Sequence, residues 1–208
     1  MIPDDADLRE TGLAASGTGR VLVIGCGALA REILAVIGAN GLAHVDVTCL
    51  PAILHNRPER IAPALEAAID RHAADYDRLF VAYADCGSGG AIAALCARHG
   101  IEMIEGPHCY SFFEGNDTFA ERGEVTAFYL TDFLARQFDA FVTKPLGLDR
   151  HPELRDMYFG NYETLVHLAQ TDDPALDAKA RAAADALGLT YERRPTGYGD
   201  LEIALQRL

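Results

Sequence analysis

The chain is poor in basic residues, and this shortage excludes several classes of partner. It has 18 Lys and Arg against 31 Asp and Glu among 208 residues, which gives a net charge of −13 at pH 7 and a pI near 4.8. Such an acidic surface repels the phosphate backbone of nucleic acids and the headgroups of anionic membranes alike. We therefore expect a small-molecule substrate, with no nucleic acid and no membrane as partner.

Long apolar runs are missing as well. No stretch approaches the roughly 20 apolar residues that a membrane-spanning helix needs, and the N-terminus is acidic where a signal peptide would be basic. These absences predict a cytoplasmic protein. Five cysteines are present, an odd number, and in a reducing compartment they are more often buried, catalytic or metal-bound than paired in disulfides.

Strand and helix signals alternate along the chain. Residues 1–19 are polar and lack a sustained period, so we expect a mobile leader followed by a single α/β domain over residues 20–208. Short apolar runs alternate with segments of helical spacing from Arg20 onward. This rhythm predicts a doubly wound, mainly parallel sheet with helices on both faces.

The second half of the chain has a different character. Aromatic residues become frequent between residues 125 and 170, and the pattern there predicts long helices over residues 128–138 and 157–168. A further helix is expected over 174–187, followed by a last strand at 189–193. We therefore expect an aromatic-rich, helical C-terminal half that could cap the crevice at the edge of the sheet.

Three cysteines, Cys26, Cys86 and Cys109, each stand where a predicted strand ends. The carboxyl ends of parallel strands face one crevice, so these thiols can converge although they are far apart in sequence. A helix N-terminus favours the thiolate, which is the form that ligates metals. The pattern predicts one metal centre, either zinc or a [4Fe–4S] cluster, with one position open for a substrate. Cys49 and Cys96 lack this placement and are expected in the core.

Two histidines and one acid lie beside the predicted thiol site. His55 follows the second predicted strand, His108 precedes Cys109, and Asp85 precedes Cys86. An imidazole can complete a zinc site or transfer protons near neutral pH, and a carboxylate can orient a ligand or act as a base. We treat His55, Asp85 and His108 as candidate catalytic residues. A thiol nucleophile or redox site at Cys86, with Asp85 and a histidine, is a further option.

Two glycine-rich turns offer an alternative without a metal. Gly25 and Gly27 fit a G-x-G-x-x-A dinucleotide pattern, but Asp46 lies in mid-strand, where it could not hold a ribose. The second turn holds Gly87, Ser88 and Gly89 and lacks the Lys-Ser/Thr ending of a P-loop. Both turns could bind an anion through backbone N–H groups. In this alternative the protein is a metal-free small-molecule binding module.

Several separate motifs support a family resemblance. Residues 25–32, 54–58, 83–90, 106–113 and 158–162, in this order, resemble a bacterial and archaeal domain-of-unknown-function family, numbered 1638. The resemblance implies an association with corrinoid-dependent methyltransferases acting on methylated amines. It therefore implies a role in one-carbon metabolism, as an enzyme (a zinc- or iron–sulfur-dependent transferase or lyase) or as an accessory factor, with proteins of the methyltransferase system as partners. The chain lacks an Asp-x-His-x-x-Gly corrinoid motif, so we expect that it does not hold cobalamin itself.

Overall fold

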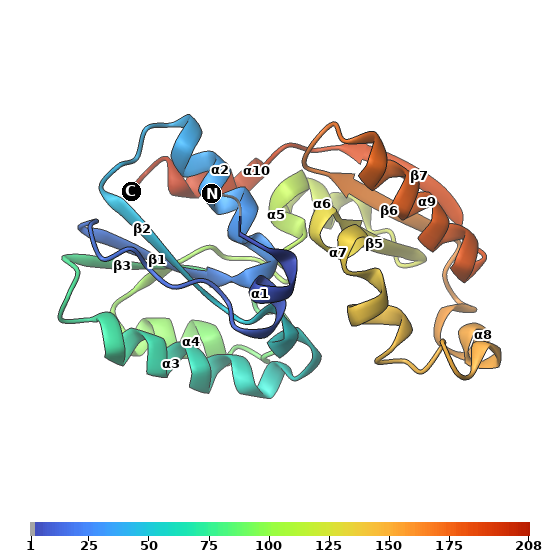
Figure 1. Ribbon diagram of the computed structural model, residues 1–208, viewed down its shortest axis with the longest axis horizontal. Coiled ribbons are helices and arrows are strands. Elements are labelled where there is room, and N and C mark those ends of the chain that lie inside the picture. The colour runs from blue at the N-terminus through green and yellow to red at the C-terminus, as the bar shows by residue number, and fades with distance from the viewer. Residues whose placement is uncertain (1–2) are drawn as a thin grey trace. The chain divides into compact units, whose positions relative to one another are not determined.

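The chain is a mixed α/β protein with two parallel sheets, as a computed structural model that describes residues 3–208 shows (Figure 1). The contacts divide it into two compact units where the sequence predicted one domain. The first unit runs up to Phe112 and includes Tyr198–Leu208, whereas the second comprises Phe113–Gly197. The C-terminal segment thus belongs to the first unit, a return that the alternation of strands and helices does not reveal.

The first unit contains a four-stranded parallel sheet in the order β2-β1-β3-β4. Its strands are β1 (Val21–Cys26), β2 (Val45–Leu50), β3 (Arg78–Ala82) and β4 (Glu102–Met103). β1 is buried along its whole length, as expected of a central parallel strand covered on both faces. The chain passes from β1 to β2 on one side and returns to β3 on the other. This reversal creates a switch point at the carboxyl ends of β1 and β3, where open α/β sheets bind ligands.

Helices cover both faces of this sheet. Helices α3 (Ile61–His72) and α4 (Ala91–His99) lie on one face, and α2 (Ala30–Ala39) and α10 (Gly199–Leu205) lie on the other (Figure 1). Each buries apolar residues at helical spacing against the strands. Short 3-10 helices follow the strand ends at Gly27–Leu29, Ala52–Asn56 and Pro58–Arg60. The predicted doubly wound, parallel architecture is confirmed for this unit.

The segment expected to be a mobile leader carries regular structure. Helix α1 (Asp5–Glu10) begins after Asp4, whose carboxylate accepts a 2.8 Å hydrogen bond from the Ala6 N–H. Leu8 on this helix is fully buried. Leu13 forms an antiparallel bridge with Cys49 through backbone hydrogen bonds of 2.9 and 2.8 Å. One buried leucine gives no detectable periodicity, which explains why the sequence pattern did not indicate this helix.

The second unit contains a three-stranded parallel sheet in the order β5-β6-β7. Its strands are β5 (Ala127–Thr131), β6 (Thr164–Ala169) and β7 (Thr190–Pro195), and its helices are α6 (Asn116–Arg122), α7 (Asp132–Arg136), α8 (Arg155–Phe159) and α9 (Pro174–Leu187). A π-helix (Asp139–Thr143) and a 3-10 helix (Pro152–Leu154) lie between α7 and α8, and α5 (Ser111–Glu114) spans the boundary of the units. No helix within residues 3–208 is long and apolar enough to cross a membrane.

Two helices predicted in this unit are wrong. Residues 128–138 form most of β5 and then α7, and residues 157–168 form the end of α8 and most of β6. Short apolar runs fit a buried strand and a buried helix equally well, because periodicity distinguishes the two only over longer segments. The helix predicted over 174–187 is α9, and the last strand is β7.

Candidate functional site

The three predicted cysteines lie at the carboxyl edge of the first sheet. Cys26 is the last residue of β1, Cys86 follows β3, and Cys109 follows β4. Two hydrogen bonds hold the last two loops together, since the Asp85 N–H donates to the Gly106 carbonyl and the Cys86 N–H donates to the Pro107 carbonyl. The switch point of the sheet is therefore lined by thiols.

Cys86 and Cys109 form a close pair. Their Sγ atoms are 3.0 Å apart, and Cys86 is only 3% exposed. Cys86 adopts φ = 47° and is the one non-glycine residue with a positive φ within residues 3–208. Such a backbone costs on the order of 1–3 kcal/mol and persists where the surroundings impose it, often at functional sites. The strained backbone and the short contact to Cys109 thus occur at the same residue.

The two thiols of the pair have opposite electrostatic character. The Cys109 thiol donates to Cys86 and is the main reason that the pKa of Cys86 falls to about 5, and the His55 side chain and the Cys109 N–H lower it further. Burial of Cys86 opposes this shift. The pKa of Cys109 is raised, chiefly because its proton is held by the Cys86 sulfur. The pair is therefore a thiolate at Cys86 that accepts from a thiol at Cys109.

Cys26 is the third thiol at this edge. Burial raises its pKa to about 12, and it interacts with the backbone N–H of Ala28, with Cys86 and with Tyr83. The Tyr83 hydroxyl is buried beside Cys26, but it makes no hydrogen bond of normal geometry. Cys49 and Cys96 are buried as predicted, although Cys49 also lies within electrostatic range of Cys26.

The predicted acid–base residues have different surroundings. His55, in the 3-10 helix after β2, interacts with the Cys86 sulfur as its placement predicted. The His108 ring instead stacks on Tyr110, with 4.9 Å between ring centroids. Asp85 accepts hydrogen bonds of 2.9 Å from the Ser88 hydroxyl and 2.6 Å from the Gly90 N–H. These bonds lower the pKa of Asp85 and order the turn that carries Cys86.

Both predicted anion turns are approached by oxygen atoms of the chain itself. A Cβ atom at Gly27 would lie 2.2 Å from the Leu8 carbonyl oxygen, so α1 covers the turn that also contains Gly25. In the second turn, Gly87 and Gly89 have φ angles of 80° and 64°, and the N–H groups around Ser88 point toward the Asp85 carboxylate. These glycines are therefore explained by close approach and turn geometry, and their role in ligand binding stays a prediction.

The geometry of the thiols bears on the predicted metal centre. Within residues 3–208, no three His, Cys, Asp or Glu side chains form a group arranged to hold a metal ion. Two thiolates on one tetrahedral zinc lie about 3.8 Å apart, because each Zn–S bond is about 2.3 Å. The 3.0 Å separation in this structure is shorter than that distance. Zinc and the [4Fe–4S] cluster stay predictions.

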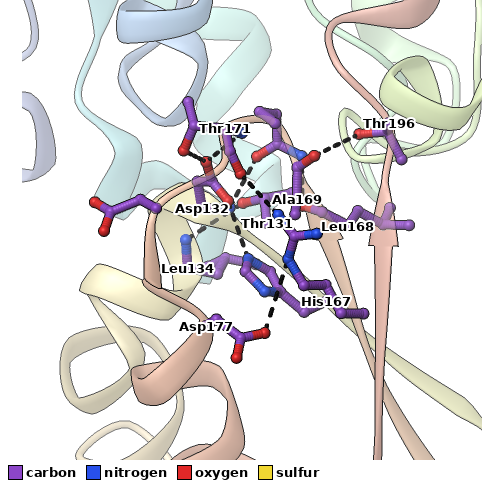
Figure 2. A network of polar contacts seen from close by, with 12 residues as sticks. Thr131, Asp132, Leu134, His167, Leu168, Ala169, Thr171, Asp177 and Thr196 are labelled. Carbon is purple, nitrogen blue, oxygen red and sulfur yellow. Dashed lines mark hydrogen bonds and ion pairs between the residues drawn. The ribbon is translucent and has the colours of Figure 1, made fainter. Parts of the chain in front are cut away.

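The second unit has a buried polar network that sequence reasoning missed. Asp132, at the start of α7, accepts from His167 Nε2 at 3.0 Å and from the Thr171 N–H and hydroxyl at 3.0 and 2.6 Å (Figure 2). The other ring nitrogen of His167 lies 3.2 Å from the Tyr191 hydroxyl, which donates to Asp177. Asp132 and His167 are each 1% exposed. Every nitrogen of the imidazole is used within the protein, so none is left for a substrate.

These features define an α/β protein with a thiol site at the switch point of its first sheet. The family described as "Protein of unknown function (DUF1638)" matches residues 49–205, and the chain belongs to this family. The match includes His55, Cys86 and Cys109, whereas Cys26 lies before it. No curated protein and no solved structure matches the chain. The role in one-carbon metabolism and the corrinoid methyltransferase partners stay predictions.

Proposed function

We propose that this protein works through a reactive dithiol, in which the Cys86 thiolate attacks a small disulfide and Cys109 completes the exchange. The observation that carries the proposal is the 3.0 Å separation of the two Sγ atoms. A disulfide bond is about 2.05 Å long, so the sulfurs need to approach by only about 1 Å to be joined.

The exchange proceeds in two balanced steps. The Cys86 thiolate displaces one thiolate from the small disulfide and forms a mixed disulfide with the other half. Cys109 then gives its proton to the released thiolate, and its sulfur attacks Cys86 Sγ and displaces the second half. Two cysteines lose two electrons, which the small disulfide gains, and one thiol and one thiolate leave. With an excess of small thiol, the same steps run in reverse.

The surroundings of Cys86 suit this chemistry. A thiolate is the attacking species, and hydrogen bonds from the Cys109 thiol, His55 and the Cys109 N–H maintain it. The constrained turn at Cys86 holds its sulfur against Cys109. Because Cys86 is only 3% exposed, we expect small reagents to react and large protein disulfides to be excluded.

The test is the reaction of the full-length reduced protein with cystamine, followed by intact mass and peptide mapping. Wild type should lose two hydrogens and form the Cys86–Cys109 disulfide. Cys109→Ser should retain a cystamine half on Cys86, because the second step is blocked, and Cys86→Ser should form neither product.

Cys96→Ser is the matched control, because Cys96 is buried on α4 in the same unit and should not affect the exchange. The proposal fails if wild type forms no Cys86–Cys109 disulfide. It fails equally if Cys109→Ser carries no adduct on Cys86.

A further inference from the structure

We propose that the second unit binds a small monocarboxylate, whose carboxylate group pairs with Arg193 in a cavity at the carboxyl ends of β6 and β7. All residues that line this cavity belong to the second unit, whereas Cys86 and Cys109 belong to the first. The proposal therefore goes beyond the proposed function and does not depend on it.

The first observation is the cavity itself. Its volume is about 360 Å³, which lies within the usual range of about 300–1,000 Å³ for small-molecule sites. β6 ends at Ala169 and β7 ends at Pro195, and both residues line the cavity together with residues 170–172, Arg193 and Gly197. Open α/β sheets bind ligands outside the carboxyl ends of their strands. The cavity therefore lies where a sheet of this kind places a ligand.

The second observation is the set of hydrogen bonds that Arg193 makes. Its side chain is 26% exposed, and its Nη2 atom donates to the Thr171 carbonyl at 3.2 Å and to the Asp172 carboxylate at 3.0 Å. Its Nε and Nη1 atoms donate no hydrogen bond to any residue within 3–208, although Nε lies 3.8 Å from an Asp177 carboxylate oxygen. Arg193 therefore has donors left for a ligand.

The third observation is the weak hold of Asp172 on this guanidinium. The Asp172 side chain is fully exposed and accepts a single hydrogen bond from Arg193, and exposed pairs of this kind contribute little. A guanidinium binds a carboxylate best through two parallel N–H groups. A ligand carboxylate can therefore replace Asp172 on Nη2 and gain a second bond from the neighbouring Nη1 or Nε.

The surroundings favour a singly charged ligand with a short apolar chain. The Asp172 and Asp177 carboxylates lie close to Arg193, and they repel a doubly charged phosphate more strongly than a monocarboxylate. Ala169 and Pro195 offer apolar contacts within the same cavity. Butyrate has both features and serves as the probe.

The buried network of the second unit orders one wall of the cavity before a ligand binds. The Thr171 N–H and hydroxyl donate to the Asp132 carboxylate at 3.0 and 2.6 Å (Figure 2). The Gln170 side-chain oxygen accepts a 2.8 Å hydrogen bond from the Asp132 N–H. A preorganised wall reduces the entropy lost on binding. The network thus fixes the shape of the site, and Arg193 supplies the charge.

The experiment titrates the full-length protein with butyrate and follows binding by saturation-transfer difference NMR. Wild type should bind butyrate saturably, and butyramide, which lacks the charge, should not compete. Arg193→Gln should weaken binding by at least about 10-fold, because it removes charge-assisted hydrogen bonds. Asp172→Asn should instead tighten binding by about two- to fivefold, because it removes the competing charge.

Arg150→Gln is the matched control. Arg150 is a 73% exposed arginine of the same unit that also pairs with an aspartate, but it does not line the cavity, so its loss should not change the affinity. Thermal melts verify that each variant folds. If Arg193→Gln does not fold, Asp172→Asn still tests the proposal, because Asp172 is fully exposed.

The outcomes separate this site from the dithiol. Wild type that reacts with cystamine but binds no butyrate overturns the carboxylate site and leaves the proposed function intact. Wild type that binds butyrate without reacting with cystamine does the reverse. Unchanged affinity in Arg193→Gln, or affinity that does not rise in Asp172→Asn, overturns the pairing with Arg193. Inorganic phosphate that binds more tightly than butyrate overturns the assignment to a monocarboxylate.

Discussion

Both parallel sheets carry buried polar residues at their carboxyl edges, but the hydrogen bonds of these residues are satisfied to different degrees. In the second unit, Asp132 and His167 are buried and every polar atom that they share has a partner (Figure 2). In the first unit, the edge contains a strained Cys86 and a buried Tyr83 hydroxyl that makes no hydrogen bond of normal geometry. A complete buried network specifies structure, whereas backbone strain and unmet hydrogen bonds are typical of sites that bind or react with another molecule.

The largest effect should follow from breaking the complete network. Asp132→Ala removes the acceptor for His167 and for the Thr171 N–H and hydroxyl, all at a buried position. We expect a loss of about 3–5 kcal/mol in the free energy of unfolding, measured by urea denaturation, because buried donors are left unpaired. Asp172→Ala is the control, since its carboxylate is fully exposed and pairs only with Arg193 at the surface, so the urea midpoint should change little.

The same network predicts a direction for the effect of pH. Hydrogen bonds from His167 and Thr171 outweigh burial and lower the pKa of Asp132 below its usual 3.8. Its contribution to stability is therefore complete above about pH 4 and is lost as the pH falls through the lowered pKa. If Asp132→Ala is as stable as wild type at pH 7, the network around Asp132 and His167 does not stabilise the second unit.

A smaller loss should follow from filling the turn beneath α1. Gly27→Ala places a Cβ atom 2.2 Å from the Leu8 carbonyl oxygen, so α1 must shift. We expect a destabilisation of about 1–3 kcal/mol in urea denaturation, as for other overpacked positions, together with faster proteolysis near Leu8. Gly38→Ala in α2 meets no atom within 4 Å and should instead stabilise by about 0.5–1 kcal/mol.

The alkylation rate of Cys86 should change by about one order of magnitude with pH. Because the pKa of Cys86 is lowered to about 5, its alkylation by iodoacetamide should be nearly constant from pH 8 to 6 and about tenfold slower at pH 4. Peptide mass spectrometry of the Cys86 peptide measures this rate. Cys109→Ala removes the largest cause of the shift and should move the fall to higher pH. If the alkylation rate of wild type instead falls around pH 8.5, Cys86 is an ordinary thiol.

The smallest effect concerns the strain at Cys86. With the thiol absent in both variants, Cys86→Gly should be about 1 kcal/mol more stable than Cys86→Ala, because only glycine adopts φ = 47° without cost. The order should reverse on α4, where Cys96→Ala should exceed Cys96→Gly by a similar amount. Equal stabilities at position 86 would mean that the turn is not strained.

The sequence predicted the first unit better than the second. Buried strands followed by glycine turns identify β1 and β3, and their parallel arrangement places Cys26 and Cys86 at one edge. The sequence also predicted that His55 lies near Cys86, and the two side chains interact. The short contact between Cys86 and Cys109 depends on how two loops bond to each other, which spacing along the chain does not determine.

The missed residues share a cause. Asp132 and His167 are 35 positions apart and meet only because β5 and β6 pair in parallel, and both segments had been predicted as helices. Tyr83 follows a buried strand among apolar residues, where a tyrosine is ordinarily part of the core. What distinguishes it is a buried hydroxyl beside Cys26 that makes no hydrogen bond of normal geometry, and this can be recognised only from three-dimensional coordinates.

The bridge between Leu13 and Cys49 has a practical consequence. β2 is an edge strand of the first sheet. Residues before Arg20 cover part of this edge through the Leu13–Cys49 bridge and through a hydrogen bond from the Thr48 hydroxyl to the Leu13 carbonyl. An uncovered edge strand is a template for pairing with other chains. We therefore expect a shortened protein that starts at Arg20 to self-associate through β2, because nothing then covers this part of the edge.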